Sequence, residues 1–175
     1  MTGRDVVRIV VTGSECTGKS TLALALAAHF GVRAAPEFLR RYFEMKNGVL
    51  TLEDAVPIAQ GQIAGEDERE MAGDNPVICD TNPLSSVVYN NYYYGSSPAW
   101  IEGRLQSRSY HHYLLCGIDV PWRADGQRDR PGEREHLQGL FRAELVRRGC
   151  AYTELFGGPE ARLAEAVRIV GSLLE

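Results

Sequence analysis

The chain has 175 residues, which is enough to bury a sizeable core within one domain, and its composition is typical of a soluble globular protein. A formal net charge of -4 argues against the broad basic surface that binds nucleic acid or an anionic membrane. We therefore expect a single domain over residues 1–175, with neither nucleic acid nor a membrane as a partner.

Residues 13–21 are the most informative segment, because their sequence, GSECTGKST, fits the phosphate-binding motif G-x-x-x-x-G-K-[ST]. The β-branched run at residues 6–11 predicts a buried strand directly before it. Residues 21–30 are rich in strong helix formers, and Gly31 then stands where a helix is expected to end. Strand, glycine loop and helix is the order that the motif requires, so we predict a nucleotide site here.

The residue types of this loop suit the chemistry of phosphate binding. Glycine at positions 13 and 18 lets the backbone bend sharply and approach an anion, so that successive N–H groups and the helix dipole face the phosphates. Lys19 is expected to reach the β- and γ-phosphates, and the Ser20 hydroxyl to ligate Mg²⁺. We predict ATP and Mg²⁺ as cofactors, with the nucleotide held by Gly13, Ser14, Glu15, Cys16, Thr17, Gly18, Lys19, Ser20 and Thr21.

Strands and helices are predicted to alternate along the rest of the chain. Four more strands are expected, at residues 32–35, 77–80, 110–116 and 151–156. Helices are expected at residues 37–43, from Thr51 through Ile63, and at 85–94, 99–107, 132–148 and 161–174. This alternation predicts an α/β fold of the P-loop NTPase type, with three α/β/α layers and a central five-stranded parallel sheet.

Two acidic residues follow predicted strands, at the sheet edge where ligands of parallel α/β folds gather. Asp80 ends the 77–80 strand, where a Mg²⁺-associated acid or a general base belongs; the alternative is an acid that caps the next helix. Glu37 opens a helix, and Arg40, one turn later on the same face, can contact Glu37 or a substrate. In the alternative interpretation, Glu37 is an acid favoured by the helix dipole at the N-terminus, and Arg40 is a solvated arginine.

Residues 119–131 form a polar, arginine-rich segment after a strand end, and we interpret it as a mobile segment that closes over phosphates. Arg128 and Arg130 are candidates to neutralise charge on a transferred phosphoryl group. Trp122 offers a flat face for stacking on a ring. The alternative is a surface loop with ordinary ion pairs.

Small residues at positions 157–158 mark the turn into the last predicted helix. Gly157 would let an adenine lie against the backbone, with Arg162 nearby. A plain strand-to-helix turn is the alternative interpretation.

The cysteines and the N-terminal residues are informative about the cellular location of the protein. Cys16, Cys79, Cys116 and Cys150 form no C-x-x-C pair, so neither a zinc site nor a disulfide framework is predicted, and reduced thiols favour a cytoplasmic location. No apolar run approaches the length of a membrane span, and we expect no signal peptide because the first residues lead directly into a strand.

Taken together, these segments resemble the ribosylnicotinamide kinase domain of bacterial NadR-type proteins over nearly the whole chain. The phosphate loop is shared by a very large superfamily, whereas D-V-P-W followed by D-G-Q-R-D is much more specific. Leu155, Gly157 and Arg162 also fit the last strand and helix of that family. The other matching segments are residues 13–23, 37–40, 60–62, 79–81, 93–95 and 119–129.

The resemblance implies a kinase that transfers a phosphoryl group from ATP to the 5′-hydroxyl of nicotinamide riboside or a related nucleoside. It implies that Lys19 and Ser20 hold phosphates and Mg²⁺, with Asp80 as a second metal ligand. Asp80 or Glu37 would position and deprotonate the hydroxyl, and Trp122 would stack near the cationic pyridinium ring. It also implies a role for Arg128 and Arg130 in a lid, and a substrate-binding set of Arg40, Asn82, Trp122 and Asp125.

One position, Asn82, departs from the family pattern. Asn82 stands where the family often carries a second aspartate, so a carboxylate that could hold Mg²⁺ or the ribose is lost.

A regulatory ATPase that binds a partner, or a kinase with a nucleoside monophosphate acceptor, is the alternative function. The adenylyltransferase and DNA-binding parts of longer relatives are expected to be absent. The sequence leaves a homo-oligomer open.

Overall fold

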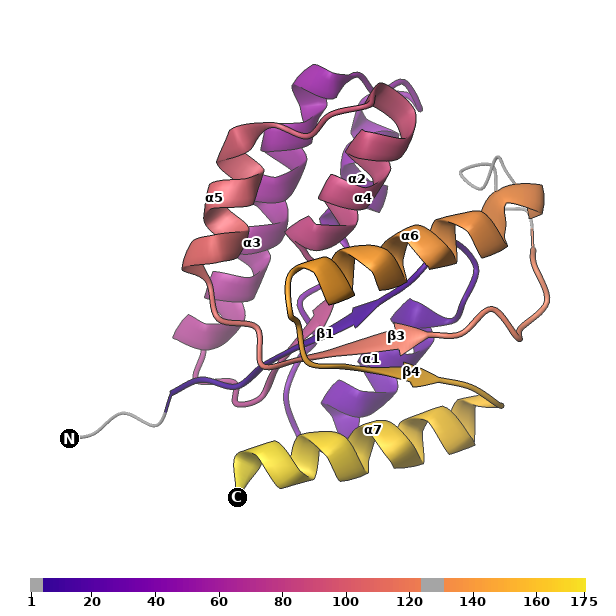
Figure 1. Ribbon diagram of the computed structural model, residues 1–175. Helices are drawn as coiled ribbons and strands as arrows, with labels where there is room; N and C mark the ends of the chain where they lie inside the picture. The colour runs from indigo at the N-terminus through magenta and orange to yellow at the C-terminus, as the bar shows by residue number, and fades with distance from the viewer. Residues whose placement is uncertain (1–4, 124–130) are drawn as a thin grey trace.

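The computed structural model describes residues 5–123 and 131–175. Strands and helices alternate through most of this range (Figure 1). The elements are β1 (Arg8–Thr12), α1 (Lys19–His29), α2 (Phe38–Met45), the short η1 (Leu52–Asp54), α3 (Ala55–Met71), β2 (Val77–Asp80), α4 (Pro83–Tyr94), α5 (Ala99–Ser107), β3 (His112–Cys116), the short η2 (Pro131–Glu133), α6 (Arg134–Arg147), β4 (Tyr152–Leu155) and α7 (Pro159–Leu174).

The four strands form one parallel sheet in the order β2-β1-β3-β4. Helices α1 and α7 cover one face, and α3, α4, α5 and α6 cover the other, so the three-layer α/β/α arrangement is confirmed (Figure 1). Alternate strand residues explain the two cores: Ile9 and Val11 pack with α1 and α7, whereas Val10 packs with the opposite helices. Because the four strands are parallel, their carboxyl ends all lie on the same side of the molecule, the side on which the phosphate loop follows β1.

The prediction of five strands is wrong for the described residues, because the segment 32–35 contributes a single bridge. Ala35 pairs with Cys79: its N–H donates to the carbonyl of Ile78 at 2.7 Å, and its carbonyl accepts from the N–H of Asp80 at 2.9 Å. The next residue, Pro36, has no N–H to continue the ladder. Pairing therefore stops after one residue, and the chain turns into α2 instead.

The predicted helices are present, and the differences lie at their ends. Helix α1 begins at Lys19, two residues earlier than expected, because Gly18 adopts φ +81° at its N-cap. Helix α4 begins at Pro83 after Asn82, whose side chain accepts from the N–H of Leu84 at 3.1 Å. Local capping therefore decides where these helices begin.

Helix α2 packs on α3 through a contact that only glycine allows. A Cβ built on Gly61 would lie 2.3 Å from the ring of Phe38, at the start of α2. Glycine at this position therefore lets the first turn of α2 approach the middle of α3.

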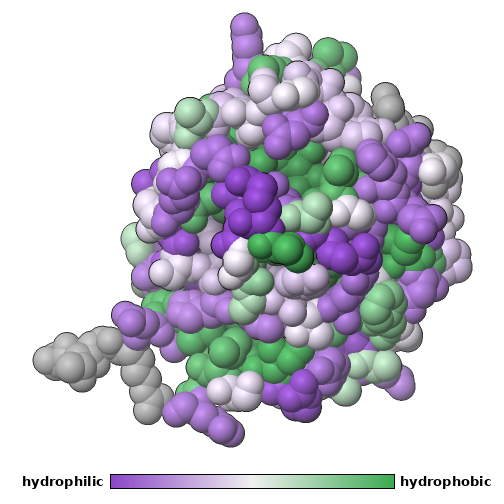
Figure 2. Space-filling model, in the orientation of Figure 1, coloured by the Kyte–Doolittle hydropathy of each residue, from purple (hydrophilic) through white to green (hydrophobic). Residues whose placement is uncertain are grey.

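On the face shown in Figure 2, hydrophilic residues predominate, and hydrophobic residues gather in separate patches between them. Within residues 5–123 and 131–175, no helix is both long enough and apolar enough to cross a membrane.

We predict that Gly61→Ala lowers the free energy of unfolding by about 1–3 kcal/mol, because its methyl group would overlap the Phe38 ring. Gly65→Ala in the same helix is the matched control, because nothing lies within 4 Å of its added Cβ. It should leave stability unchanged or raise it by up to about 1 kcal/mol. Urea denaturation measures both; equal stabilities of the two variants would contradict the packing argument.

Candidate active site

The phosphate loop connects the end of β1 to the start of α1 and needs glycine at two places. Gly13 has φ +134°, and a Cβ there would lie 2.9 Å from the carbonyl oxygen of Cys116, so the loop lies against the end of β3. Gly18 has φ +81° immediately before the first residue of α1. These conformations favour glycine and let the helix begin with its N-terminus toward the loop.

Side chains within and behind the loop fix its shape. The carbonyl of Ser14 accepts from Lys19 Nζ at 2.7 Å and from Thr17 Oγ1 at 3.0 Å. The N–H of Ser14 donates to Gln138 Oε1 of α6 at 3.0 Å. Since a phosphate is a charged acceptor, it would bind Lys19 more strongly than this neutral carbonyl does.

Ser20 and Asp80 meet at the edge of the sheet. Ser20 Oγ donates to Asp80 Oδ2 at 2.6 Å, while Asp80 Oδ1 is buried and has no hydrogen-bond partner among the described residues. Burial raises the pKa of Asp80, although the Ser20 hydrogen bond and the charges of Lys19 and Arg40 oppose the shift. The hydroxyl and the unpartnered carboxylate oxygen are hard oxygen donors of the type that Mg²⁺ prefers.

A cavity of about 620 Å³ opens beside the loop and extends between α2, α3 and α4. Its volume falls in the range of small-molecule sites. It brings together the predicted residues Glu37, Arg40 and Asn82 with seven consecutive residues of the loop segment, Glu15 through Thr21. Aromatic and apolar side chains form its far wall, including Phe43, Leu50, Ile58, Tyr89, Tyr93 and Tyr94.

Gln62 lines this cavity, although the sequence pattern did not indicate it as a site residue. Its Oε1 accepts from the N–H of Phe38 at 2.9 Å, and its Nε2 donates to the carbonyl of Thr81 at 3.3 Å. A single buried amide thus joins the start of α2, which follows Glu37, to the residue that follows Asp80. The segment Gln60-Gly61-Gln62 was the only signal in the sequence that could have found it.

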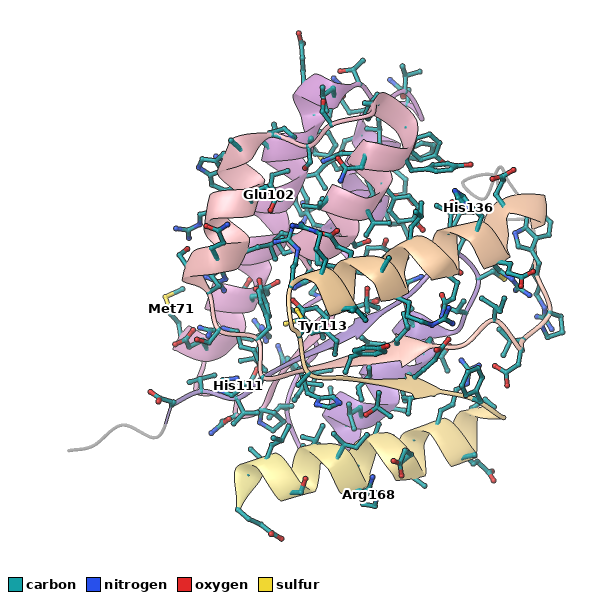
Figure 3. All side chains as sticks on the ribbon, viewed as in Figure 1. Met71, Glu102, His111, Tyr113, His136 and Arg168 are labelled. Atoms are coloured by element: carbon teal, nitrogen blue, oxygen red, sulfur yellow. The ribbon has the colours of Figure 1, made fainter. Side chains whose placement is uncertain are left out.

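Asn82 is almost fully buried, and its two polar atoms have partners in the protein. Its Oδ1 caps α4 at the N–H of Leu84, and its Nδ2 donates to the hydroxyl of Tyr113 at 3.0 Å. Tyr113 lies on β3, close to α6 in the view of Figure 3. Asn82 therefore has a structural role here, and its role in substrate binding stays a prediction.

The predicted adenine-side residues line a second, smaller recess of about 110 Å³. Gly157 and Arg162 meet Gly18 and Thr21 there, and the last two residues also line the larger cavity. The guanidinium of Arg162 contacts the carboxylate of Asp119, a residue for which the sequence indicated no individual role.

Trp122 does not line the larger cavity, but it lies in a segment that contacts the phosphate loop. Cys16 Sγ donates to the carbonyl of Pro121 at 3.5 Å and accepts from the N–H of Arg123 at 3.0 Å. Arg134, in the first turn of α6, donates to the carbonyls of Cys16 and, at 2.7 Å, of Val120. The predicted residues Asp125, Arg128 and Arg130 lie outside the described residues, and their roles stay predictions.

A parallel α/β sheet, a G-x-x-x-x-G-K-[ST] loop after β1 and a strand-end carboxylate that accepts a hydrogen bond from the first helix define a P-loop nucleotide-binding protein. The profile of a family described as an AAA domain matches residues 8–162. The chain therefore belongs to this AAA domain family.

Among curated proteins, the chain is similar to the trifunctional NAD biosynthesis/regulator protein NadR of Escherichia coli (strain K12), with 26% identity over 139 residues. The match covers 76% of this chain and 34% of that protein, so the chain spans about a third of the length of this curated relative.

Solved structures agree with this similarity. The crystal structure of NadR protein in complex with NR has a TM-score of 0.81 at 20% identity, and the complex with NAD and AMP-PNP has a TM-score of 0.79 at 20% identity; each covers 95% of this chain and 49% of the other. Thymidylate kinase from Ehrlichia chaffeensis follows with a TM-score of 0.69 at 13% identity, over 95% of this chain and 100% of that one. The fold is that of small P-loop kinases, and the predicted resemblance to NadR-type domains is confirmed.

We predict that Asp80→Asn raises stability at about pH 8 while abolishing activity, a trade-off typical of active sites. Since burial raises the pKa of Asp80 above its ordinary 3.8, the folded protein disfavours the charged carboxylate, and stability is lost as the pH rises through that pKa. The amide removes this cost, so the gain should shrink toward pH 4.

Urea denaturation at several pH values measures the effect of Asp80→Asn. Glu68→Gln, at an exposed carboxylate of α3, is the control and should change stability by less than about 0.5 kcal/mol. A loss of stability in Asp80→Asn at the higher pH would contradict the argument that burial makes the charged Asp80 carboxylate unfavourable in the folded protein.

Proposed function

We propose that this chain is an ATP-dependent kinase that transfers the γ-phosphate to the 5′-hydroxyl of nicotinamide riboside, forming nicotinamide mononucleotide. The observation that carries the proposal is the continuous cavity that joins the phosphate loop, with Lys19 and Ser20, to the wall formed by α2, α3 and α4. A donor phosphate at the loop and an acceptor against that wall would share one cavity, which is what direct transfer between them requires.

The two candidate acids take different positions relative to this cavity: Glu37 lines it, whereas Asp80 lies behind Ser20 and is not part of its lining. Asp80 bonds to Ser20, the expected Mg²⁺ ligand, so we assign Asp80 to the metal side of the site. Mg²⁺, when bound there with the nucleotide, would neutralise charge on the β- and γ-phosphates. Glu37 precedes α2 and lines the cavity, so we assign it to orient the acceptor hydroxyl and accept its proton.

The far wall of the cavity suits a cationic aromatic acceptor. Tyr89, Tyr93, Tyr94 and Phe43 present aromatic rings, and aromatic faces attract a pyridinium ring. The similar fold of NadR protein in complex with NR supports this class of acceptor. Stacking by Trp122 remains a further prediction of the same proposal.

A nucleoside monophosphate acceptor is the second candidate, and the fold shared with thymidylate kinase is the observation in its favour. Such an acceptor needs cations for its own phosphate. Among the described residues that line the cavity, the cations are Lys19 and Arg40, and Lys19 belongs to the donor loop. Within the described lining this leaves Arg40 for an acceptor phosphate, so we favour the riboside.

The proposal also includes a cytoplasmic location for the protein. All four cysteines are free, and Cys79 and Cys116 are buried, which supports a reducing, cytoplasmic location. The substrate is a small molecule, and self-association remains open.

The test is product formation from ATP and a panel that includes nicotinamide riboside, other nucleosides and nucleoside monophosphates. Nicotinamide riboside should give the highest kcat/KM. Higher kcat/KM for a monophosphate would replace the proposal with the second candidate, and ATP binding without turnover of any acceptor would favour a regulatory ATPase.

We predict that Lys19→Ala lowers kcat/KM for phosphoryl transfer by at least about 100-fold, because it removes a cation from the developing phosphate charge. Lys46→Ala, at the only other lysine of the chain, is the matched control. Lys46 pairs with Asp54 at 3.2 Å, apart from the loop, and its loss should change kcat/KM by less than about threefold. Equal activities of the two variants would contradict the assignment of the donor site.

A further inference from the structure

Arg162, in the first turn of α7, is a buried charged residue whose hydrogen bonds join the phosphate loop, residues 117–119 and the turn at Gly157. Its side chain is 4% exposed. Nε donates to the carbonyl of Gly157 at 2.9 Å, one terminal nitrogen to that of Thr17 at 2.6 Å, and the other to that of Gly117 at 3.1 Å. The last nitrogen also contacts the carboxylate of Asp119. A buried guanidinium with this many protein acceptors has little capacity left to bind a ligand directly.

The bond to Thr17 determines which way the phosphate loop presents its amide groups. The C=O and N–H of a trans peptide point in opposite directions. When Arg162 holds the carbonyl of Thr17 on its own side, the N–H of Gly18 must point to the other side of that peptide. Gly18 and its neighbours in the loop line the larger cavity. The contact therefore favours an orientation in which this amide faces a bound anion instead of its carbonyl.

Asp119 extends the same contact to the adenine-side turn. One carboxylate oxygen contacts Arg162, and the other accepts from the N–H of Gly157 at 2.6 Å. These bonds lower the pKa of Asp119, which favours its charged carboxylate. Burial of the Arg162 charge is favourable only with such a partner.

The pair also lies beside the smaller recess. That recess is bounded by Gly18 and Thr21 on the loop side and by Gly157 and Pro159 on the turn side, with Arg162 between them. The distance between the phosphate loop and the Gly157 turn therefore depends on the residues that join the two, Arg162 and Asp119.

We propose that Arg162 and Asp119 are positioning residues for the nucleotide: together they orient the loop amides and set the spacing between the loop and the turn at Gly157. The inference rests on the proposed function only in that a nucleoside triphosphate binds at the loop. It assigns the pair no contact with the acceptor. Losing the pair therefore weakens ATP binding and leaves acceptor binding nearly unchanged.

The main variant is Asp119→Asn, which removes the charge from a partly exposed side chain and keeps its size. It should raise the Kd for Mg-ATP and the KM for ATP about tenfold, the effect expected from a lost charged hydrogen bond. The KM for the acceptor should change less than about twofold. Asp119→Glu, which restores the charge, should recover part of the affinity, whereas a change in overall stability alone would not separate the two KM values.

A second variant tests whether Arg162 and Asp119 act on nucleotide binding through one shared contact. Arg162→Lys keeps the charge but loses the planar set of donors, and it should weaken Mg-ATP binding at least as much as Asp119→Asn. The double variant should be no weaker than the worse single variant, because both act through one contact. Fully additive losses would contradict a joint role.

The matched control is the Glu165–Arg168 pair on the same helix. These residues pair at 2.6 Å, and Figure 3 shows Arg168 on the outer side of α7. Glu165→Gln and Arg168→Lys should leave both KM values unchanged. Thermal unfolding of all variants, followed by circular dichroism, shows whether each is folded at the assay temperature.

Calorimetry with Mg-ATP and with inorganic tripolyphosphate separates failure of this inference from failure of the proposed function. If the wild-type chain binds neither compound, the nucleotide site itself is wrong. If it binds Mg-ATP and Asp119→Asn binds equally well, the positioning role is wrong while the proposed function stands. We expect Asp119→Asn to weaken Mg-ATP binding more than tripolyphosphate binding, because only ATP also reaches the turn. An equal KM change for ATP and acceptor would also overturn the inference.

Discussion

The site depends on one constraint: several consecutive backbone amides must face the same anion, while their carbonyls are satisfied elsewhere. A loop with this property is costly to form, because each peptide unit carries a strong acceptor beside its donor. Here the carbonyl of Ser14 is held inside the loop by Lys19 and Thr17, and those of Cys16 and Thr17 are held from outside by two arginines. Positive φ at Gly13 and Gly18 then allows the remaining amides to converge.

The three-layer arrangement supplies what the loop needs around it. Because the sheet is parallel, the ends of β1, β2 and β3 meet at one edge, and the loop, Asp80 and the segment after Cys116 are neighbours there. Two hydrophobic cores, one on each face, fix the strands and therefore these ends. Helices α2, α3 and α4 contribute residues to the wall of the larger cavity beside the loop.

Asn82 shows how a departure from a family pattern can be understood from its surroundings. A carboxylate would serve the N–H of Leu84 equally well, but the hydroxyl of Tyr113 would then have to donate instead of accept. The amide satisfies both neighbours in a buried position without placing a second negative charge near Asp80. The loss of that charge is therefore compatible with an intact site, and Asp80 retains the contact with Ser20.

The sequence by itself determined the features that are local along the chain. The order of strand, glycine loop and helix, the acid at the end of β2 and the limits of α5 follow from periodicity, glycine positions and caps, which involve residues only a few positions apart. Only the tertiary structure decided that residues 32–35 form one bridge, that Gln62 joins α2 to Thr81, and that Arg162 holds Thr17. These contacts join residues 19 to 145 positions apart, and no short-range pattern encodes them. They form because the parallel sheet brings distant chain segments to one edge, where each buried polar group must find a partner.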